Sequence, residues 1–160
     1  MAHKILLTGA SGGIGYAVFQ QLLRTKKYSL SIFIRESRKN IKRFTPYQDE
    51  INIIYGDLTN SDDLHQINEL YDVVIHLAAI IPPIAYKSKS NTHKVNFLGT
   101  QLLLKHFESY CPSAFFMFSS SVAIYGDRLK NPEIRISDPL HDDDEDFYVQ
   151  SKIKAEEVVQ

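Results

Sequence analysis

Two residues near the end of the 160-residue chain, Tyr148 and Lys152, have the types and the spacing needed to move a proton. They lie four apart, so on a helix both side chains project from one face. An ammonium group beside the ring favours phenolate over phenol, which lets a tyrosine act as acid or base near neutral pH. The pair also occurs by chance on many helices, as a surface tyrosine beside a solvated lysine. Its meaning therefore depends on the rest of the chain.

A glycine-rich loop at the other end of the chain could hold a phosphate. Four of the seven glycines lie in Thr8-Gly-Ala-Ser-Gly-Gly-Ile-Gly15, between the apolar run 4–7 and a segment of helical periodicity. Unpaired N–H groups and the helix dipole suit a phosphate at a helix N-terminus, and glycines let the backbone approach it closely. The loop lacks the Gly-Lys-Ser/Thr of a P-loop. Its context favours a dinucleotide, with a tight turn that binds nothing as the alternative.

The segments between these two features predict the frame that positions them. Apolar runs of strand length recur after the first, at 30–34, 51–55, 72–77 and 114–118. Segments with helical patterns occur after Gly15, over 61–70, around 95–107 and from about 145 to the end. Residues 35–43 form a polar basic stretch, and residues 78–91 are predicted to be a loop. Continuous apolar strands alternating with helices are typical of a parallel sheet covered on both faces. The prediction is a doubly wound α/β fold, Rossmann-like, with strand order 3-2-1-4-5.

In such a sheet the ligand lies at the carboxyl ends of the strands, where this chain places polar and small residues. Arg35 follows the second run, where an acidic residue would bind the ribose hydroxyls of NAD. Arginine suits the 2′-phosphate of NADP instead, and the adjacent Glu36 is expected to point away. Asp57 follows the third run and could accept a hydrogen bond from adenine. The alternatives are a solvated basic loop for Arg35 and a turn cap for Asp57.

Composition excludes several classes of function. The net charge of -1 argues against nucleic acid or an anionic membrane as partner, and the single cysteine, Cys111, excludes an internal disulfide. No long apolar span is present, so a soluble, cytoplasmic, one-domain protein is expected. His76 ends an apolar strand and is predicted to be a core histidine rather than a metal ligand. The acidic run 142–146 is predicted to be a solvated loop before the last helix, so no metal site is expected.

Taken together, these residues resemble the extended short-chain dehydrogenase/reductase superfamily, in particular the NAD(P)-dependent epimerases and dehydratases of nucleotide sugars. Six motifs occur in family order: Thr8-Gly-x-x-Gly-x-x-Gly15, Tyr55-Gly-Asp57-Leu58, His76-Leu-Ala-Ala79, Val95-Asn96-x-x-Gly99-Thr100, Ser119-Ser-Ser-x-x-x-Tyr125-Gly126 and Tyr148-x-x-Ser151-Lys152. Each motif is weak by itself, and the series in order is specific.

The resemblance implies hydride transfer to or from a nicotinamide cofactor, with a nucleotide sugar or another small hydroxyl or ketone compound as substrate. Its implied catalytic residues are Ser121, Tyr148, Lys152 and Asn96. Tyr148 would exchange the substrate proton, Lys152 would bind the nicotinamide ribose and Ser121 would orient the substrate oxygen, while Asn96 matches the helix asparagine near the active site. The cofactor-binding residues it implies are Gly9, Ser11, Gly12, Gly13, Ile14, Gly15, Arg35, Asp57, Leu58, Leu77, Ala78, Ala79, Ser119, Tyr148 and Lys152.

Two departures from the family pattern shape the expected activity. The chain ends within a helical pattern, so residues 1–160 are expected to be the cofactor-binding half of a longer enzyme. This half would be inactive alone, because it lacks the final strands and the carboxyl-terminal substrate domain. Val122 and Ala123 stand where family dehydratases carry an Asp-Glu pair, which disfavours dehydration.

Two further expectations concern partners. The open sheet edge beyond 114–118 predicts self-association, for example as a homodimer. A non-catalytic NADP-binding regulatory module is the alternative to an enzyme, and it would have no need of Tyr148, Lys152 or Ser121.

Overall fold

The computed structural model describes residues 2–141 and 145–160. Its helices and strands in chain order are β1 (His3–Thr8), α1 (Gly13–Thr25), β2 (Tyr28–Ile34), α2 (Arg38–Phe44), η1 (Thr45–Tyr47), β3 (Asn52–Tyr55), α3 (Ser61–Leu64), β4 (Val73–His76), η2 (Ala85–Lys87), α4 (Lys89–His93), the π-helix η3 (Lys94–Leu98), α5 (Gly99–Tyr110), β5 (Phe115–Phe118), η4 (Val122–Tyr125) and α6 (Phe147–Val159). Within these described ranges, no helix combines the length and the apolar character that crossing a membrane requires.

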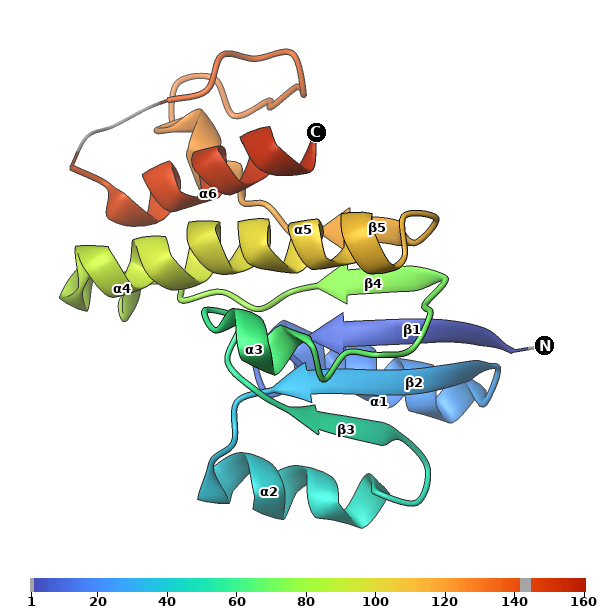
Figure 1. Ribbon diagram of the computed structural model, residues 1–160. Coiled ribbons are helices and arrows are strands. Elements are labelled where there is room, and N and C mark those ends of the chain that lie inside the picture. The colour runs from blue at the N-terminus through green and yellow to red at the C-terminus, as the bar shows by residue number, and fades with distance from the viewer. Residues whose placement is uncertain (1, 142–144) are drawn as a thin grey trace. The chain divides into compact units, whose positions relative to one another are not determined.

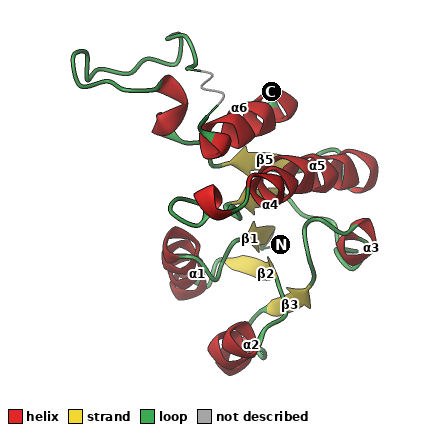
Figure 2. Ribbon diagram, turned by 90° about the vertical axis from the view of Figure 1, so that its left-hand side faces the viewer, coloured by secondary structure: helices red, strands yellow, loops and turns green. Residues whose placement is uncertain are grey.

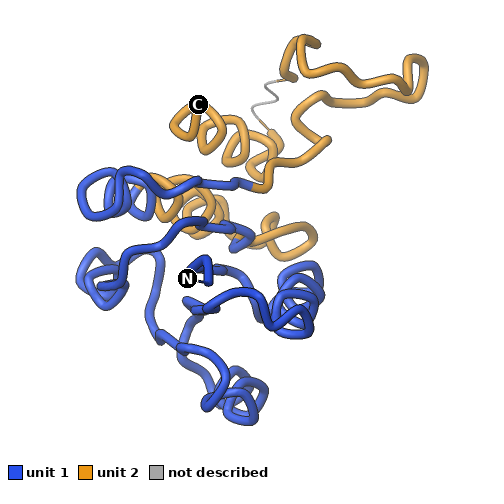
Figure 3. Tube along the Cα trace, turned by 90° about the vertical axis from the view of Figure 1, so that its right-hand side faces the viewer, with its two compact units in different colours: residues 1–78, 102–118 blue, residues 79–101, 119–160 orange. Residues whose placement is uncertain are grey.

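The chain divides into two compact units, drawn in blue and orange in Figure 3. The first unit comprises residues 1–78 and 102–118, and the second comprises 79–101 and 119–160. The first therefore carries the glycine loop and all five strands, and the second carries Tyr148 and Lys152.

The first unit is built on a five-stranded sheet in which every neighbouring pair is parallel. The strand order is β3-β2-β1-β4-β5, which confirms the predicted order and the doubly wound α/β class (Figure 1). Thr8 at the end of β1 pairs in register with Phe33 on β2 and with His76 on β4. The carboxyl ends of the central strands therefore reach the same edge of the sheet, next to the glycine loop.

Helices cover both faces of this sheet, as its apolar strands predicted (Figure 2). Along β1, Ile5 and Leu7 pack on one face with Phe19 of α1 and Phe44 of α2. Leu6 points to the opposite face, into a cluster with α3 and α5 side chains such as Leu64 and Phe107. Because consecutive strand residues alternate between faces, one strand contributes to both clusters.

Two elements of the first unit differ from the prediction. Residues 38–44, expected to be a polar stretch, form α2, whose N-terminus is capped by the Ser37 hydroxyl and whose Phe44 packs edge-on against Phe19. The helix predicted over 61–70 is wrong in length, because α3 ends at Leu64. Beyond it, the amide of Ile67 donates to the carbonyl of Leu64, an i to i-3 bond that closes a turn and buries the Ile67 side chain.

The second unit is organised by α6. Val149 and Ile153 of α6 pack with Ile124 of the short helix η4. Asp146 caps α6 by accepting hydrogen bonds from the amides of Tyr148 and Val149. The carboxylate before this helix therefore stabilises its N-terminus as expected, whereas Asp142, Asp143 and Asp144 of the same acidic run lie outside the described residues.

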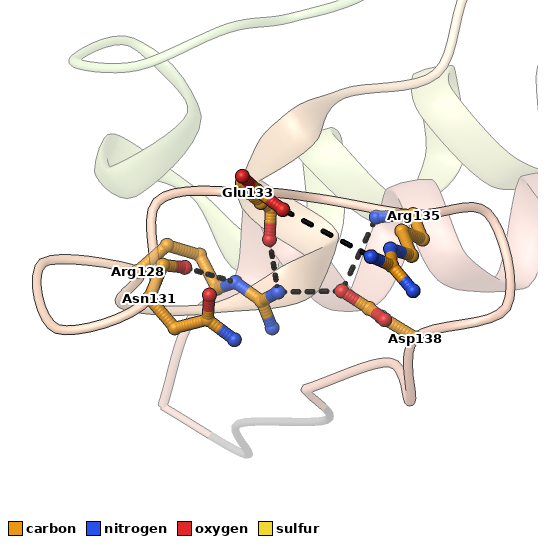
Figure 4. A network of polar contacts seen from close by, with 5 residues as sticks. All are labelled: Arg128, Asn131, Glu133, Arg135 and Asp138. Atoms are coloured by element: carbon orange, nitrogen blue, oxygen red, sulfur yellow. Dashed lines mark hydrogen bonds and ion pairs between the residues drawn. The ribbon is translucent and has the colours of Figure 1, made fainter.

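A polar network shapes the loop between η4 and α6 (Figure 4). The Arg128 guanidinium donates to the carbonyls of Asn131 and Glu133 and forms an ion pair with Asp138. Asp138 also accepts a hydrogen bond of 3.2 Å from the Arg135 amide. One arginine thus joins three points of the loop.

Candidate functional site

The glycine loop is fixed by backbone contacts that leave no room for side chains at two positions. Gly9 has a φ of 75°, and a Cβ there would lie 2.6 Å from the amide nitrogen of Ala78. A Cβ on Gly15 would lie 2.1 Å from the carbonyl oxygen of Gly9. Gly9 and Gly15 are therefore required by the fold itself, whether or not a ligand binds.

The other two glycines of the loop face open space. A Cβ on Gly13 would meet no atom within 4 Å, and one on Gly12 would meet only the Gly9 carbonyl, at 3.4 Å. Gly12 is the N-cap of the 13-residue helix α1 and supplies no side-chain oxygen to its first-turn amides. These amides and the positive end of the helix dipole are therefore available to an anion, so the loop fits a pyrophosphate.

Buried polar groups join the ends of β1 and β4 beside this loop. Thr8 Oγ1 lies 2.7 Å from His76 Nδ1, and it accepts a hydrogen bond of 3.3 Å from the Ala78 amide. His76 is 1% exposed and lies against the rings of Phe116 and Phe118. The prediction that His76 is a core histidine is confirmed. The hydrogen-bonded pair of Thr8 and His76 also holds Leu77 and Ala78, two of the predicted cofactor residues, against Gly9.

Arg35 and Asp57, two of the residues predicted to bind the adenosine end, line a common cavity of about 490 Å³. Its walls are formed by Arg35, Glu36, Tyr55, Gly56, Asp57, Asp63 and Gln66. Glu36 is among these lining residues, and the expected direction of its side chain, away from the ribose position, stays a prediction. Leu58 belongs to the core cluster beside α3 and is 7% exposed.

Asp57 also fulfils the local role considered for it. Its Oδ1 accepts hydrogen bonds of 2.8 Å from both the amide and the hydroxyl of Thr59. The Asp57 amide in turn donates to the Asp63 carboxylate at 2.7 Å. The carboxylate is thus held in a fixed orientation in the cavity wall, as a turn cap and as a lining residue together.

Arg43 is a neighbour of the glycine loop that the sequence did not reveal. From α2 it donates a hydrogen bond of 2.9 Å to the Ser11 carbonyl, and its guanidinium lies 4.6 Å from the centre of the Tyr16 ring. The contact spans 32 positions of the chain, and no motif relates the two segments. It brings positive charge to the loop and fixes the position of Ser11.

In the second unit, Tyr148 and Lys152 lie one helical turn apart on α6, and both are buried, with 9% and 4% of their surfaces exposed. Lys152 Nζ donates a hydrogen bond of 2.7 Å to the Ser119 carbonyl. Burial lowers the pKa of Lys152 from 10.5 to about 8, and the Glu156 carboxylate acts in the opposite direction. The alternative of a surface tyrosine beside a solvated lysine is therefore excluded.

The serine segment 119–121 lies along this helix. Besides the contact through Ser119, the Ser120 hydroxyl donates to Glu156 Oε2 at 2.9 Å. Ser121 is the N-cap of η4, and its Oγ accepts a hydrogen bond of 3.3 Å from the Ala123 amide. As a hydroxyl both donates and accepts, the Ser121 O–H group can donate a further hydrogen bond.

Asn96 lies in the π-helix η3 and is 1% exposed. Its amide group accepts a hydrogen bond of 2.7 Å from the Ile80 amide, and donates to the Ile80 carbonyl at 2.9 Å and to Ser151 Oγ at 3.0 Å. Ser151 in turn donates to the Tyr148 carbonyl at 2.8 Å. Asn96 therefore positions α6 and the segment after Ala79, and its contacts are with protein groups.

A separate cavity of about 670 Å³ lies beside α6, on the side of α4 and η3. It is lined by Lys89, Ser90, His93, Lys94, Leu98, Phe147, Gln150, Ser151 and Lys154. Neither Tyr148 nor Lys152 lines it, so its size does not make it the reactive site. No group of three or more His, Cys, Asp or Glu side chains with metal-binding geometry occurs in residues 2–141 and 145–160.

Together, the parallel sheet, the open glycine loop and the buried Tyr148–Lys152 pair define a dinucleotide-binding protein of the short-chain dehydrogenase type. The sequence profile of the NAD dependent epimerase/dehydratase family matches residues 5–160, and the chain belongs to this family.

Individual relatives agree with this assignment. D-erythronate dehydrogenase of Haemophilus influenzae is 31% identical over 132 residues, which cover 79% of this chain and 40% of that protein. A short-chain dehydrogenase/reductase superfamily protein of Agrobacterium tumefaciens, solved with bound NAD, is 25% identical, with a TM-score of 0.75 over 98% of this chain and 44% of its own. The UDP-Glc/GlcNAc 4-epimerase of Campylobacter jejuni shares the fold, with a TM-score of 0.84, 24% identity, and coverage of 99% and 48%.

The chain spans less than half the length of each of these three proteins.

Proposed function

We propose that the full-length protein is an NAD(P)-dependent oxidoreductase or epimerase acting on a hydroxyl or ketone group of a small molecule. The observation that carries the proposal is the buried pair of Tyr148 and Lys152 on α6, with the Lys152 ammonium bound to the Ser119 carbonyl. A protein that only sensed the cofactor would gain nothing from desolvating a lysine beside a tyrosine. Perturbed ionisable groups of this kind are typical of active sites.

The residues of the first unit would hold the adenosine and pyrophosphate parts of the cofactor. The first-turn amides of α1 would bind the pyrophosphate over Gly12 and Gly13. Arg35 and Asp57 would face the adenosine across their shared cavity. When bound, the cofactor supplies the hydride acceptor or donor, and this chain's residues supply binding and proton transfer.

The residues of the second unit would transfer the proton, bind the nicotinamide ribose and orient the substrate. Tyr148 would take the proton of a substrate hydroxyl during oxidation and return it during reduction. The Lys152 ammonium would favour the phenolate form and bind the nicotinamide ribose. Ser121 would donate its O–H to the substrate oxygen and orient it. Asn96 would act as a positioning residue, which its hydrogen bonds to Ile80 and Ser151 support.

Redox or epimerisation is favoured over dehydration as the overall reaction. Elimination of water requires an additional acid or base near the leaving hydroxyl. Val122 and Ala123 follow Ser121 at the start of η4, and neither side chain can transfer a proton. The fold neighbours include a nucleotide-sugar epimerase and the sequence relatives include a sugar-acid dehydrogenase, so sugar-derived compounds, nucleotide sugars above all, are the proposed substrates.

We propose NADP over NAD as the preferred cofactor, because Arg35 occupies the position that faces the adenine ribose. Its guanidinium can bind a 2′-phosphate through two charge-assisted hydrogen bonds. Glu36 lines the same cavity and opposes a phosphate there. The balance of these charges supports a preference rather than exclusive use of NADP.

The proposal is tested by adding candidate sugar nucleotides and sugar acids to the full-length protein saturated with NADP or NAD. An enzyme is expected to change the nicotinamide absorbance with at least one compound, or to convert a nucleotide sugar into its epimer as followed by NMR. Tight cofactor binding without turnover of any compound would favour the regulatory module instead.

A further inference from the structure

Glu156 lies one turn beyond Lys152 on α6, so Tyr148, Lys152 and Glu156 follow one another along one helix face. Its carboxylate accepts the Ser120 hydroxyl at 2.9 Å, while Lys152 donates to the neighbouring Ser119 carbonyl at 2.7 Å. Two consecutive residues of the serine segment are thus bound by two α6 side chains one turn apart.

This arrangement restricts the next residue, Ser121, as well. Ser121 is the N-cap of η4, and Ile124 of that helix packs on Val149 and Ile153 of α6. The segment is therefore attached to α6 on both sides of Ser121, by polar contacts before it and by apolar packing after it. Loss of the Ser120–Glu156 hydrogen bond would remove one of these attachments and leave the segment before Ser121 less firmly held.

Glu156 also lies where its charge acts on Lys152, one turn away, whereas the Asp146 carboxylate caps the first turn of α6. The elements that pack against α6 are η2, α4, η3 and η4. Their titratable side chains are basic or phenolic: Tyr86, Lys87, Lys89, His93, Lys94 and Tyr125. Within this set of elements, carboxylates occur on α6 itself, as Glu156 and the exposed Glu157. A half-buried carboxylate one turn from a buried ammonium stabilises the charged form of that ammonium.

We propose that Glu156 is a positioning residue of the Tyr148–Lys152 site, which holds Ser120 and thereby the serine segment on α6, and which keeps Lys152 protonated. The role rests on the proposed function for its effect on turnover, but not for its effect on Lys152. In agreement with it, Glu156 raises the pKa of Lys152 against the larger effect of burial. Without Glu156, Lys152 would lose its proton at lower pH, and with it the charge that favours the Tyr148 phenolate.

The test is an NMR titration of the full-length protein with ¹³C-labelled lysine, in which the Lys152 signal is assigned by its loss in Lys152→Met. Glu156→Gln keeps an oxygen that can accept the Ser120 hydroxyl but removes the charge. It is expected to move the Lys152 midpoint down by about one pH unit. Glu157→Gln, one residue along the same helix, is the matched control and should leave the midpoint unchanged. Equal midpoints in Glu156→Gln and Glu157→Gln would overturn the electrostatic part of the proposal.

The positioning part is tested by Ser120→Ala, which removes the hydroxyl and keeps both charges. Turnover should fall while the Kd of the cofactor stays the same, since the glycine loop is untouched. An unchanged kcat in Ser120→Ala would overturn this part. If Tyr148→Phe keeps full turnover while Glu156→Gln still shifts Lys152, the proposed function fails and the coupling between Glu156 and Lys152 stands.

Discussion

The ammonium group of Lys152, a residue that is 4% exposed, donates a hydrogen bond of 2.7 Å to the carbonyl oxygen of Ser119 in the half-buried serine segment. Three hydrogens of an ammonium need acceptors, and burying the charge is unfavourable unless they are found. The bond therefore does two things. It orients Lys152 toward the serine segment, and it offsets part of the free energy lost by taking the charge out of water.

The first prediction is that Lys152 lowers the stability of the protein at neutral pH. Its pKa is about 8 in the folded protein and near 10.5 when unfolded, so between these values the unfolded chain binds more protons. The unfolding free energy of the wild type should therefore rise, relative to Lys152→Met, as the pH increases from about 8 to about 10.5. The rise should be at most about 3 kcal/mol.

Chemical denaturation of both proteins at about pH 7 and about pH 10 measures this difference. Lys154→Met, on the exposed face of the same helix, is the control and should show no such pH dependence. A difference between the wild type and Lys152→Met that does not change with pH would contradict the prediction.

The second prediction separates the glycines needed by the fold from those needed by the ligand. Gly9→Ala should lower the unfolding free energy by about 3 kcal/mol or more, because φ is positive and the new methyl group overlaps the backbone of Leu77 and Ala78. Gly13→Ala should change it by less than about 1 kcal/mol, because the methyl group enters open space at a helix start.

Titration with the cofactor measures the other effect, the change in cofactor affinity. Gly13→Ala is expected to stay folded and to bind the cofactor more weakly, since its methyl group occupies space proposed for the pyrophosphate. Unchanged cofactor affinity in Gly13→Ala would place the pyrophosphate elsewhere.

The third prediction concerns the choice between NADP and NAD. Removing the guanidinium in Arg35→Asp should lower the ratio of NADP to NAD affinity by about ten- to a hundredfold, which corresponds to one charge-assisted contact. Glu36→Gln should raise the same ratio, because it removes a carboxylate from the same cavity.

Isothermal titration of the three proteins with both cofactors measures the ratios. Lys39→Gln, an exposed residue of the same basic stretch, serves as the control. A wild type that binds NAD as tightly as NADP, or an Arg35→Asp variant with an unchanged ratio, would show that Arg35 does not contact the 2′-phosphate.

The strands could be predicted from the sequence, and two of the helices could not. Strand positions and their order followed from apolar runs such as Leu30–Ile34, because a strand covered on both faces has little choice of side chains. The α2 helix was missed because it buries only Asn40 and Phe44, too few apolar positions to give a helical pattern. The predicted helix over 61–70 was too long because Ile67 fits the apolar spacing of a helix. In the fold, Ile67 closes a turn after α3 instead.

Within the candidate site, contacts that are local in the sequence could be predicted, and contacts between distant segments could not. Tyr148 and Lys152 could be paired from the sequence because they lie within one helix turn. The contacts of Arg43 with Ser11 and of Ser120 with Glu156 join segments 32 and 36 residues apart, and only the tertiary fold brings them together.

The most direct test of the central claim is the activity of Tyr148→Phe in the full-length protein, measured together with its cofactor affinity. The variant loses one hydroxyl from a buried ring, so it should remain folded, bind the cofactor as the wild type does, and lose at least about a hundredfold in kcat. Tyr86→Phe removes the hydroxyl of a tyrosine in the same unit that is 53% exposed and donates to Asp146 at 3.2 Å, and it should keep full activity. Turnover by Tyr148→Phe at the rate of the wild type and of Tyr86→Phe would contradict the assignment of Tyr148 as the proton-transferring group.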